Sequence, residues 1–151
     1  DLKWWSGLTM GDVKRALAQL DVVEVELDEG TGVLLAADLE AVVDDEPWVA
    51  LLPGLDPTPM GYIERGWFLG PHLATVFDRT GNVGPTIWVD GRIAGGWAQR
   101  KNGTLAYKLL EDVGAAASRA VEAAAHDLSR WLGPIRITPR FRTPLERELS
   151  D

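Results

Sequence analysis

The sequence contains no cysteine and only two histidines among its 151 residues. The lack of cysteine excludes disulfide bonds and thiolate metal sites. The histidines, His72 and His126, fall on different predicted elements without the spacing of metal ligands, so we expect no metal site. We likewise expect no cofactor, because the glycines of Gly91–Gly96 have the wrong spacing for a phosphate-binding loop.

Long apolar runs are also missing. No charge-free apolar stretch is long enough to span a membrane, and no segment has the basic start and apolar centre of a signal peptide. We therefore expect a cytoplasmic protein without membrane contact. The chain opens at Asp1 without a methionine and runs directly into apolar sequence, which indicates a fragment of a longer protein.

Positive charge is scarce and unevenly distributed. The formal net charge is −8, which argues against a protein that coats nucleic acid non-specifically, because such binding depends on Lys and Arg meeting phosphates. Residues 1–60 hold thirteen acidic and three basic residues, and residues 61–151 hold ten acidic and twelve basic residues. The two parts therefore carry −10 and +2, so a surface for a polyanion is expected in the second part.

Residues 1–46 are predicted to form a winged-helix module. Residues 1–6 are predicted to be the end of a helix or an entry segment. After them, apolar residues recur at helical spacing over residues 10–20, behind the predicted N-cap Thr9. Residues 22–27 alternate between apolar and acidic side chains, and residues 33–36 form the return strand of a hairpin. Helix, helix and hairpin follow one another in the order of a winged helix.

The charges of this module argue against reading a DNA groove. The predicted wing carries the acidic residues Glu24, Glu26, Asp28 and Glu29. Phosphates would repel them, and the helix offers only Lys14 and Arg15 as cations. A structural or domain-packing winged helix is therefore favoured, and DNA contact through Lys14 and Arg15 is the alternative.

Residues 47–151 are predicted to form a second domain of mixed sheet and helix, which makes the whole chain α+β. Within residues 84–111 three antiparallel strands are joined by Asp90-Gly91 and Asn102-Gly103, dipeptides that favour type I′ turns because both central residues need φ > 0. The spacing over residues 114–132 predicts a long packing helix.

The connecting segments of this domain give weaker signals. Residues 49–52 are predicted to form a buried strand, and residues 53–59 an irregular connection, because they contain three prolines. Two short helical pieces are expected at residues 62–69 and 71–77, and residues 139–151 are expected to be a polar tail.

The three-stranded meander carries the best candidates for phosphate contacts. They are Arg92, Arg100, Lys101 and Lys108, with Arg140 and Arg142 as candidates in the tail. Trp97 lies between two glycines and a basic pair, where an aromatic ring could stack on a base or wedge a duplex. Packing of Trp97 against the long helix is the favoured alternative.

Several segments, spread over nearly the whole chain, also carry a resemblance to a known family. They are Asp1–Leu8, Leu51–Asp56, Gly61–Arg65, Gly84–Arg92, Gly95–Trp97 and Thr138–Phe141. They resemble the C-terminal part of bacterial winged-helix DNA-binding domain proteins related to the AlkZ and YcaQ DNA glycosylases. The resemblance implies tandem winged helices, a β-barrel-like region that follows them, and a role in binding or repairing DNA.

The resemblance transfers no catalytic residue to this chain. The catalytic motif of the family's glycosylases is Gln-x-Gln or Gln-x-Asp in an N-terminal portion that is missing here, and Gln19-Leu20-Asp21 is a chance match at a helix end. We therefore expect a portion that binds double-stranded DNA and works with upstream winged-helix domains of the same parent chain.

Two other functions are compatible with the sequence. The charge of residues 1–60 favours a structural or protein-interaction module that does not touch DNA. An enzyme that acts on a small molecule would place Asp56 or Glu64 in a pocket, with the pKa of that carboxyl raised.

Overall fold

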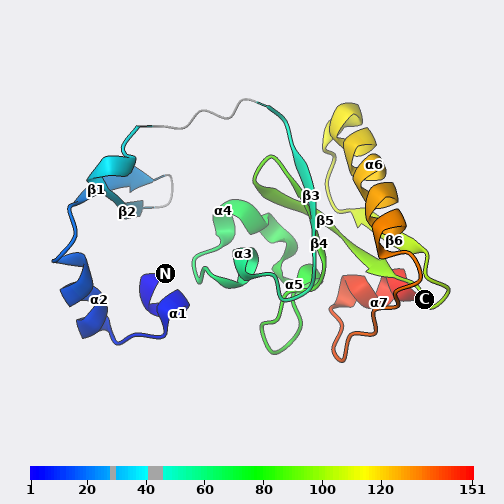
Figure 1. The fold of residues 1–151 in the computed structure, drawn as a ribbon, viewed down its shortest axis with the longest axis horizontal. Coiled ribbons are helices and arrows are strands. Elements are labelled where there is room, and N and C mark those ends of the chain that lie inside the picture. Colours follow the sequence, from blue (N-terminus) through cyan, green and yellow to red (C-terminus); the bar gives the residue numbers. More distant parts are fainter. Residues whose placement is uncertain (28–29, 41–45) are drawn as a thin grey trace. The chain divides into compact units, whose positions relative to one another are not determined.

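The computed structural model describes residues 1–27, 30–40 and 46–151. They form two compact units, residues 1–46 with 61–64, and residues 47–60 with 65–151. Each unit combines helices with an antiparallel sheet (Figure 1). The mixed helix and antiparallel-strand composition predicted from the sequence is therefore confirmed.

The first unit contains two helices followed by a hairpin, in the predicted order. The elements are α1 (Leu2–Ser6), α2 (Met10–Leu17), β1 (Val22–Leu27), β2 (Gly30–Leu35) and the 3-10 helix η1 (Ala36–Asp38). The predicted N-cap is confirmed, since the Thr9 hydroxyl accepts a hydrogen bond from the Asp12 N–H at 3.2 Å. Asp28 and Glu29 of the predicted wing lie outside the described residues.

Helix α2 ends earlier than predicted. It stops at Leu17 because the next turn tightens: Gln19 N–H bonds to Ala16 O and Leu20 N–H bonds to Leu17 O, both three residues back.

The second unit is built on a four-stranded sheet. Its strands are β3 (Val49–Leu52), β4 (Thr86–Val89), β5 (Arg92–Gln99) and β6 (Leu105–Leu109). They pair antiparallel in the order β3-β4-β5-β6. In the described residues the sheet is open, with β3 and β6 at its edges, so the barrel-like closure implied by the resemblance is not observed.

The helices of the second unit include two that the sequence analysis missed. They are α3 (Pro57–Met60), α4 (Gly66–Leu69), the 3-10 helix η2 (Gly70–His72), α5 (Leu73–Val76), α6 (Gly114–Leu132) and α7 (Pro144–Ser150). The prediction of a long helix over residues 114–132 is confirmed. The predictions of an irregular connection over residues 53–59 and of a polar tail over residues 139–151 were wrong, because α3 and α7 form there. Both helices begin with a proline at the first helical position.

One of the two predicted type I′ turns is confirmed. Asp90 and Gly91 both have positive φ, 46° and 83°. At the second turn only Gly103 does, with φ of 93°. There the Gly103 N–H bonds to Arg100 O at 2.8 Å and the Arg100 N–H bonds to Thr104 O at 2.8 Å, a longer loop in which one residue needs the left-handed conformation.

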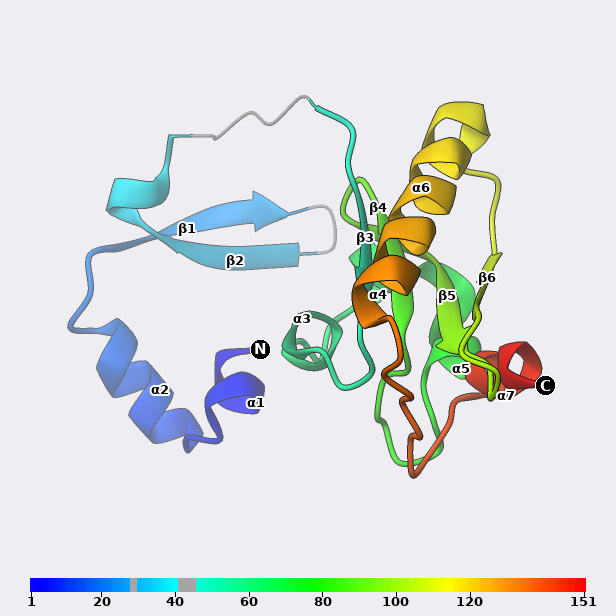
Figure 2. The ribbon, with the colours of Figure 1, turned by 45° about the vertical axis from the view of Figure 1, so that its right-hand side comes forward.

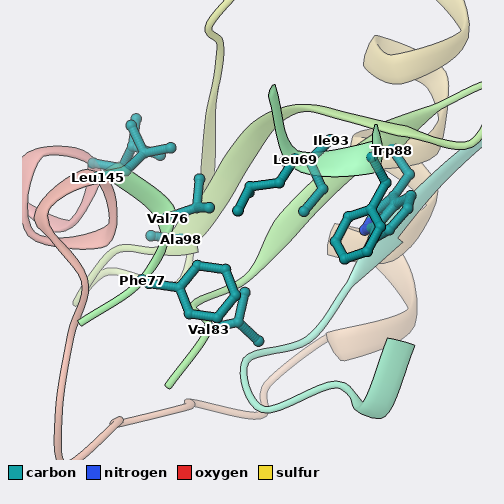
Figure 3. Close-up of a cluster of buried hydrophobic side chains, with 10 residues drawn as sticks. Leu69, Val76, Phe77, Val83, Trp88, Ile93, Ala98 and Leu145 are labelled. Carbon is teal, nitrogen blue, oxygen red and sulfur yellow. The ribbon is translucent and has the colours of Figure 1, made fainter. Parts of the chain in front are cut away.

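Helices and their side chains cover both faces of the four-stranded sheet. Figures 1 and 2 show α6 along one face, where Val121 packs against Ile87 and Trp97. On the other face a larger cluster, drawn in Figure 3, gathers side chains from β4, β5, α4, α5 and α7. Phe68 stacks on Trp88 within that cluster, with ring centroids 5.3 Å apart.

A β-bulge in β5 determines which face each side chain meets. Ile87 pairs with Gly95 but Trp88 pairs with Ile93, so Ala94 is the extra residue. Because an added residue reverses the alternation, Trp97 lies on the α6 face although Ile93 lies on the opposite one.

Candidate nucleic-acid interface

Three cationic residues lie in or against the turn between β5 and β6. Arg100 and Lys101 belong to the turn itself and are exposed. Arg136, from the segment after α6, donates from Nη2 to Asn102 O at 3.4 Å and from Nη1 to Gly133 O at 3.1 Å. We call Arg100, Lys101 and Arg136 the turn cluster.

The structure explains why Arg136 reaches this turn. A Cβ atom on Gly103 would lie 2.3 Å from the Arg136 Cζ, so the guanidinium occupies space that only a glycine leaves open. The Arg100 Nε donates to Leu149 O at 3.2 Å, which ties the other side of the turn to α7. Arg136 was not predicted from the sequence, because nothing local links it to a turn more than thirty residues earlier.

Two other predicted cations of the meander lie away from this cluster. Arg92 is exposed at the opposite end of β5, which at strand geometry is about 25 Å long. The Lys108 Nζ lies 2.6 Å from Glu148 Oε1, in an exposed ion pair that a phosphate would have to displace.

Three of the four remaining predicted cations, all but Lys14, contact a neighbouring side chain. Arg140 is exposed, with its guanidinium 5.4 Å from the Phe141 ring centroid. The Arg142 Nε lies 3.9 Å from Glu146 Oε1. On α2, Lys14 and Arg15 are exposed, and Arg15 pairs with Asp12.

Trp97 does not offer its ring at the surface. It is only 5% exposed, it packs in the cluster that contains Val121 of α6, and its Nε1 donates to Leu52 O at 2.9 Å. Packing of Trp97 against the long helix, which the sequence favoured over stacking on a base or wedging a duplex, is therefore observed.

The second unit also contains a cleft of about 300 Å³. Four segments line it: residues 53–55, the loop that contains Asp78 and residues 82–85, residues 97–99 of β5, and residues from Ile137 to Glu146. Of the two carboxylates that the sequence analysis considered for a pocket, neither lines this cleft. Asp56 instead caps α3 by accepting the Thr58 N–H at 2.8 Å, and Glu64 is exposed in the first unit.

The carboxyl groups that do line the cleft are Asp78 and Glu146, and their surroundings shift their pKa values in opposite directions. The backbone N–H of Asn82, with further hydrogen bonds from Thr80 and Asn82, lowers the pKa of Asp78 to about 2. Burial raises the pKa of Glu146 above its usual value, against the opposing charge of Arg142 and the Thr143 N–H.

Glu146 is part of a capping box at the start of α7. The Thr143 hydroxyl accepts the Glu146 N–H at 3.3 Å, and the Glu146 carboxylate accepts the Thr143 N–H in return. The pattern Thr143-Pro144-Leu145-Glu146 is the sequence signal that could have predicted α7 and the position of this carboxyl.

Two kinds of feature are absent from the part of the chain that the structure describes. No three His, Asp or Glu side chains there come together as a metal site would require. The helices there include none with the length and apolar character needed to cross a membrane.

The sequence also matches a known protein family. The family model of the DNA glycosylase AlkZ-like proteins matches residues 1–131. The chain belongs to this family. No curated protein and no solved structure gives a significant match.

Membership of the AlkZ-like family relates the chain to DNA repair. The matched residues include Arg100 and Lys101 but stop before Arg136, α7 and the Ile137–Glu146 wall of the cleft. The family match therefore covers the β5–β6 turn, whereas the groups that brace the turn and close the cleft lie beyond it.

Proposed function

We propose that this chain is the DNA-binding portion of a glycosylase-related repair protein. In this proposal Arg100 and Lys101 of the turn cluster meet the phosphates of double-stranded DNA, and the first unit is a winged helix. The catalytic residues belong to upstream winged-helix domains of the same parent chain. The AlkZ-like family supports the relation to DNA, and the turn cluster supports the choice of surface.

The gathering of cations at one turn is the observation that carries this proposal. The chain has a formal charge of −8, yet the hydrogen bonds described above for Arg100 and Arg136 go to carbonyl oxygens and not to carboxylates. Arg136 already bonds to carbonyl oxygens, so its part is to hold the turn. Arg100 and Lys101 remain exposed and can each displace a counterion from a phosphate.

A titration of a short fluorescent duplex over a salt series tests the turn cluster. The double variant Arg100→Glu with Lys101→Glu is expected to bind more weakly than the unchanged chain. Its plot of log affinity against log salt should be shallower by about two units, because two phosphate contacts are lost. Fluorescence anisotropy measures both quantities.

The matched control makes the same change of net charge elsewhere on the second unit. Arg79→Glu with Arg119→Glu alters two exposed positions outside the turn and should leave most of the affinity intact. Equal losses in the two double variants would show that net charge, and not the turn, governs binding.

A protein-interaction module that does not bind DNA is the second candidate, and the first unit favours it. Among the described residues of that unit Val13 alone is buried, while Trp5 is 72% exposed. Exposed apolar surface of this kind commonly marks contacts with another protein. No binding of the unchanged chain to the duplex, even at low salt, would support this candidate.

A further inference from the structure

The cleft of the second unit has the size and lining of a small-molecule site, and the proposed DNA contacts do not use it. Its volume of about 300 Å³ lies at the lower end of the range for ligand pockets. Its apolar walls come from Pro53, Leu55, Val83, Pro85, Ile137 and Phe141. A ligand that fits it therefore needs a largely apolar body.

Most polar groups of the lining are already engaged. The Gln99 amide donates to Ile135 O at 3.0 Å and accepts from the Ile137 N–H at 2.8 Å. The Asp78 Oδ1 accepts the N–H groups of Thr80 and Asn82, at 2.8 and 2.9 Å. These groups shape the walls and leave little capacity for a ligand.

The Glu146 carboxylate differs from the polar groups of Gln99 and Asp78 in the hydrogen-bonding capacity that it keeps. Glu146 is only 5% exposed, yet it lines the cleft. Its carboxylate accepts the Thr143 N–H, while the Arg142 Nε at 3.9 Å is beyond hydrogen-bond distance. A carboxylate has about four acceptor positions, so Glu146 keeps acceptor capacity in a place where water is largely excluded.

The ionisable groups in and around the cleft carry charges of both signs. The ionisable groups of the lining are Asp78, Glu146 and Arg140, and Arg140 is exposed. Arg142 and Arg147 also act on Glu146 but do not offset its burial. With both acids ionised, the lining has two negative charges and one positive charge, and the Arg142 guanidinium next to Glu146 adds a second positive charge.

We propose that this cleft binds a small planar aromatic cation, of the class of aromatic amidines, with Glu146 as its anionic partner. The aromatic ring matches the apolar walls, and the two N–H groups of an amidinium match the two oxygens of a carboxylate. The volume exceeds what a bare guanidinium would fill, so the ring is part of the recognition.

The test compares benzamidine with benzamide, two probes of nearly equal shape that differ in charge. Heteronuclear NMR of the full chain without DNA follows the amide signals of cleft residues such as Val83 and Ala98. Benzamidine is expected to bind about tenfold more tightly than benzamide, a preference of about 1.4 kcal/mol. Equal affinity for the two probes, or no shift of cleft signals at about 10 mM benzamidine, would overturn the proposal.

Two variants locate the site. Glu146→Gln keeps a capping-box acceptor and removes the charge, so it should abolish the preference for benzamidine while the chain stays folded. Gly54→Leu should weaken both probes, because a Cβ there has its closest contact at 3.6 Å and the side chain would extend along Val83 and Pro85. Unchanged binding in both variants would show that the probe sits elsewhere.

This site and the proposed DNA contacts are tested separately. The probe titration contains no DNA, and the duplex titration uses substitutions outside the cleft lining. Failure of one proposal therefore leaves the other standing on its own observations.

Discussion

Glu146 is a buried acidic residue that caps the start of α7 together with Thr143. At low pH its carboxyl is protonated in both the folded and the unfolded chain. As the pH rises past the ordinary pKa of 4.5, the unfolded chain ionises first, and folding then opposes ionisation of the buried group. The contribution of Glu146 to stability is therefore complete below pH 4.5 and is lost as the pH rises through the raised folded pKa.

Glu146→Gln is expected to flatten this dependence. The variant should be at least as stable as the unchanged chain at neutral pH, because Gln supplies the capping acceptor without a buried charge. Unfolding temperatures from circular dichroism, recorded from below pH 4.5 to neutral, measure the difference. A variant that unfolds at lower temperature only at neutral pH, and not below pH 4.5, would mean that the charge itself supports α7.

The pKa of Asp78 is shifted in the opposite direction from that of Glu146. The backbone N–H of Asn82, together with hydrogen bonds from Thr80 and the Asn82 side chain, lowers the pKa of Asp78 to about 2, from the ordinary 3.8. Its contribution to stability is present above pH 3.8 and is lost as the pH falls through about 2. Asp78→Asn should be less stable at neutral pH and should lack this loss in acid, which the same thermal scans measure. Parallel curves for the two chains would contradict the assignment.

At the scale of elements, β5 depends on its glycines. A Cβ on Gly95 would lie 2.3 Å from the Lys108 carbonyl oxygen of β6, a contact that real side chains do not make. Gly95→Ala is therefore expected to lower the free energy of unfolding by about 1–3 kcal/mol, the usual effect of overpacking. Urea denaturation measures it.

Gly54→Ala is the matched control for that substitution. The nearest atom to a Cβ at residue 54 is 3.6 Å away, an ordinary contact, so its stability should change little. Equal losses at the two positions would indicate a general effect of replacing glycine and not a close approach of β5 to β6.

How far the sequence could predict each element depends on whether its signal is local. Helix α6 was predicted with its observed bounds, because its periodicity and Gly133 lie within one stretch. The strands of the meander were predicted for the same reason. The alternation of side chains along β5 did not predict the face of the sheet on which Trp97 lies. That face depends on a β-bulge, and the bulge depends on the partner strand.

At the scale of the whole molecule, the sites are assembled from distant segments. The resemblance of short segments was enough to identify the family, since motifs are local. The turn cluster includes Arg136 from a distant segment, and the cleft is lined both by Asp78 of a loop and by Glu146 of α7. Such meetings follow from topology and could not be read from spacing along the chain.

The last helix also has a practical meaning for anyone who produces this protein. Leu145 and Leu149 of α7 are buried in the sheet's larger core, and Leu149 O holds Arg100. A boundary drawn at residue 131, where the family match stops, would remove α7 together with one wall of the cleft. Homology alone would thus give a truncated polypeptide with an uncovered core, prone to aggregate before any binding assay began.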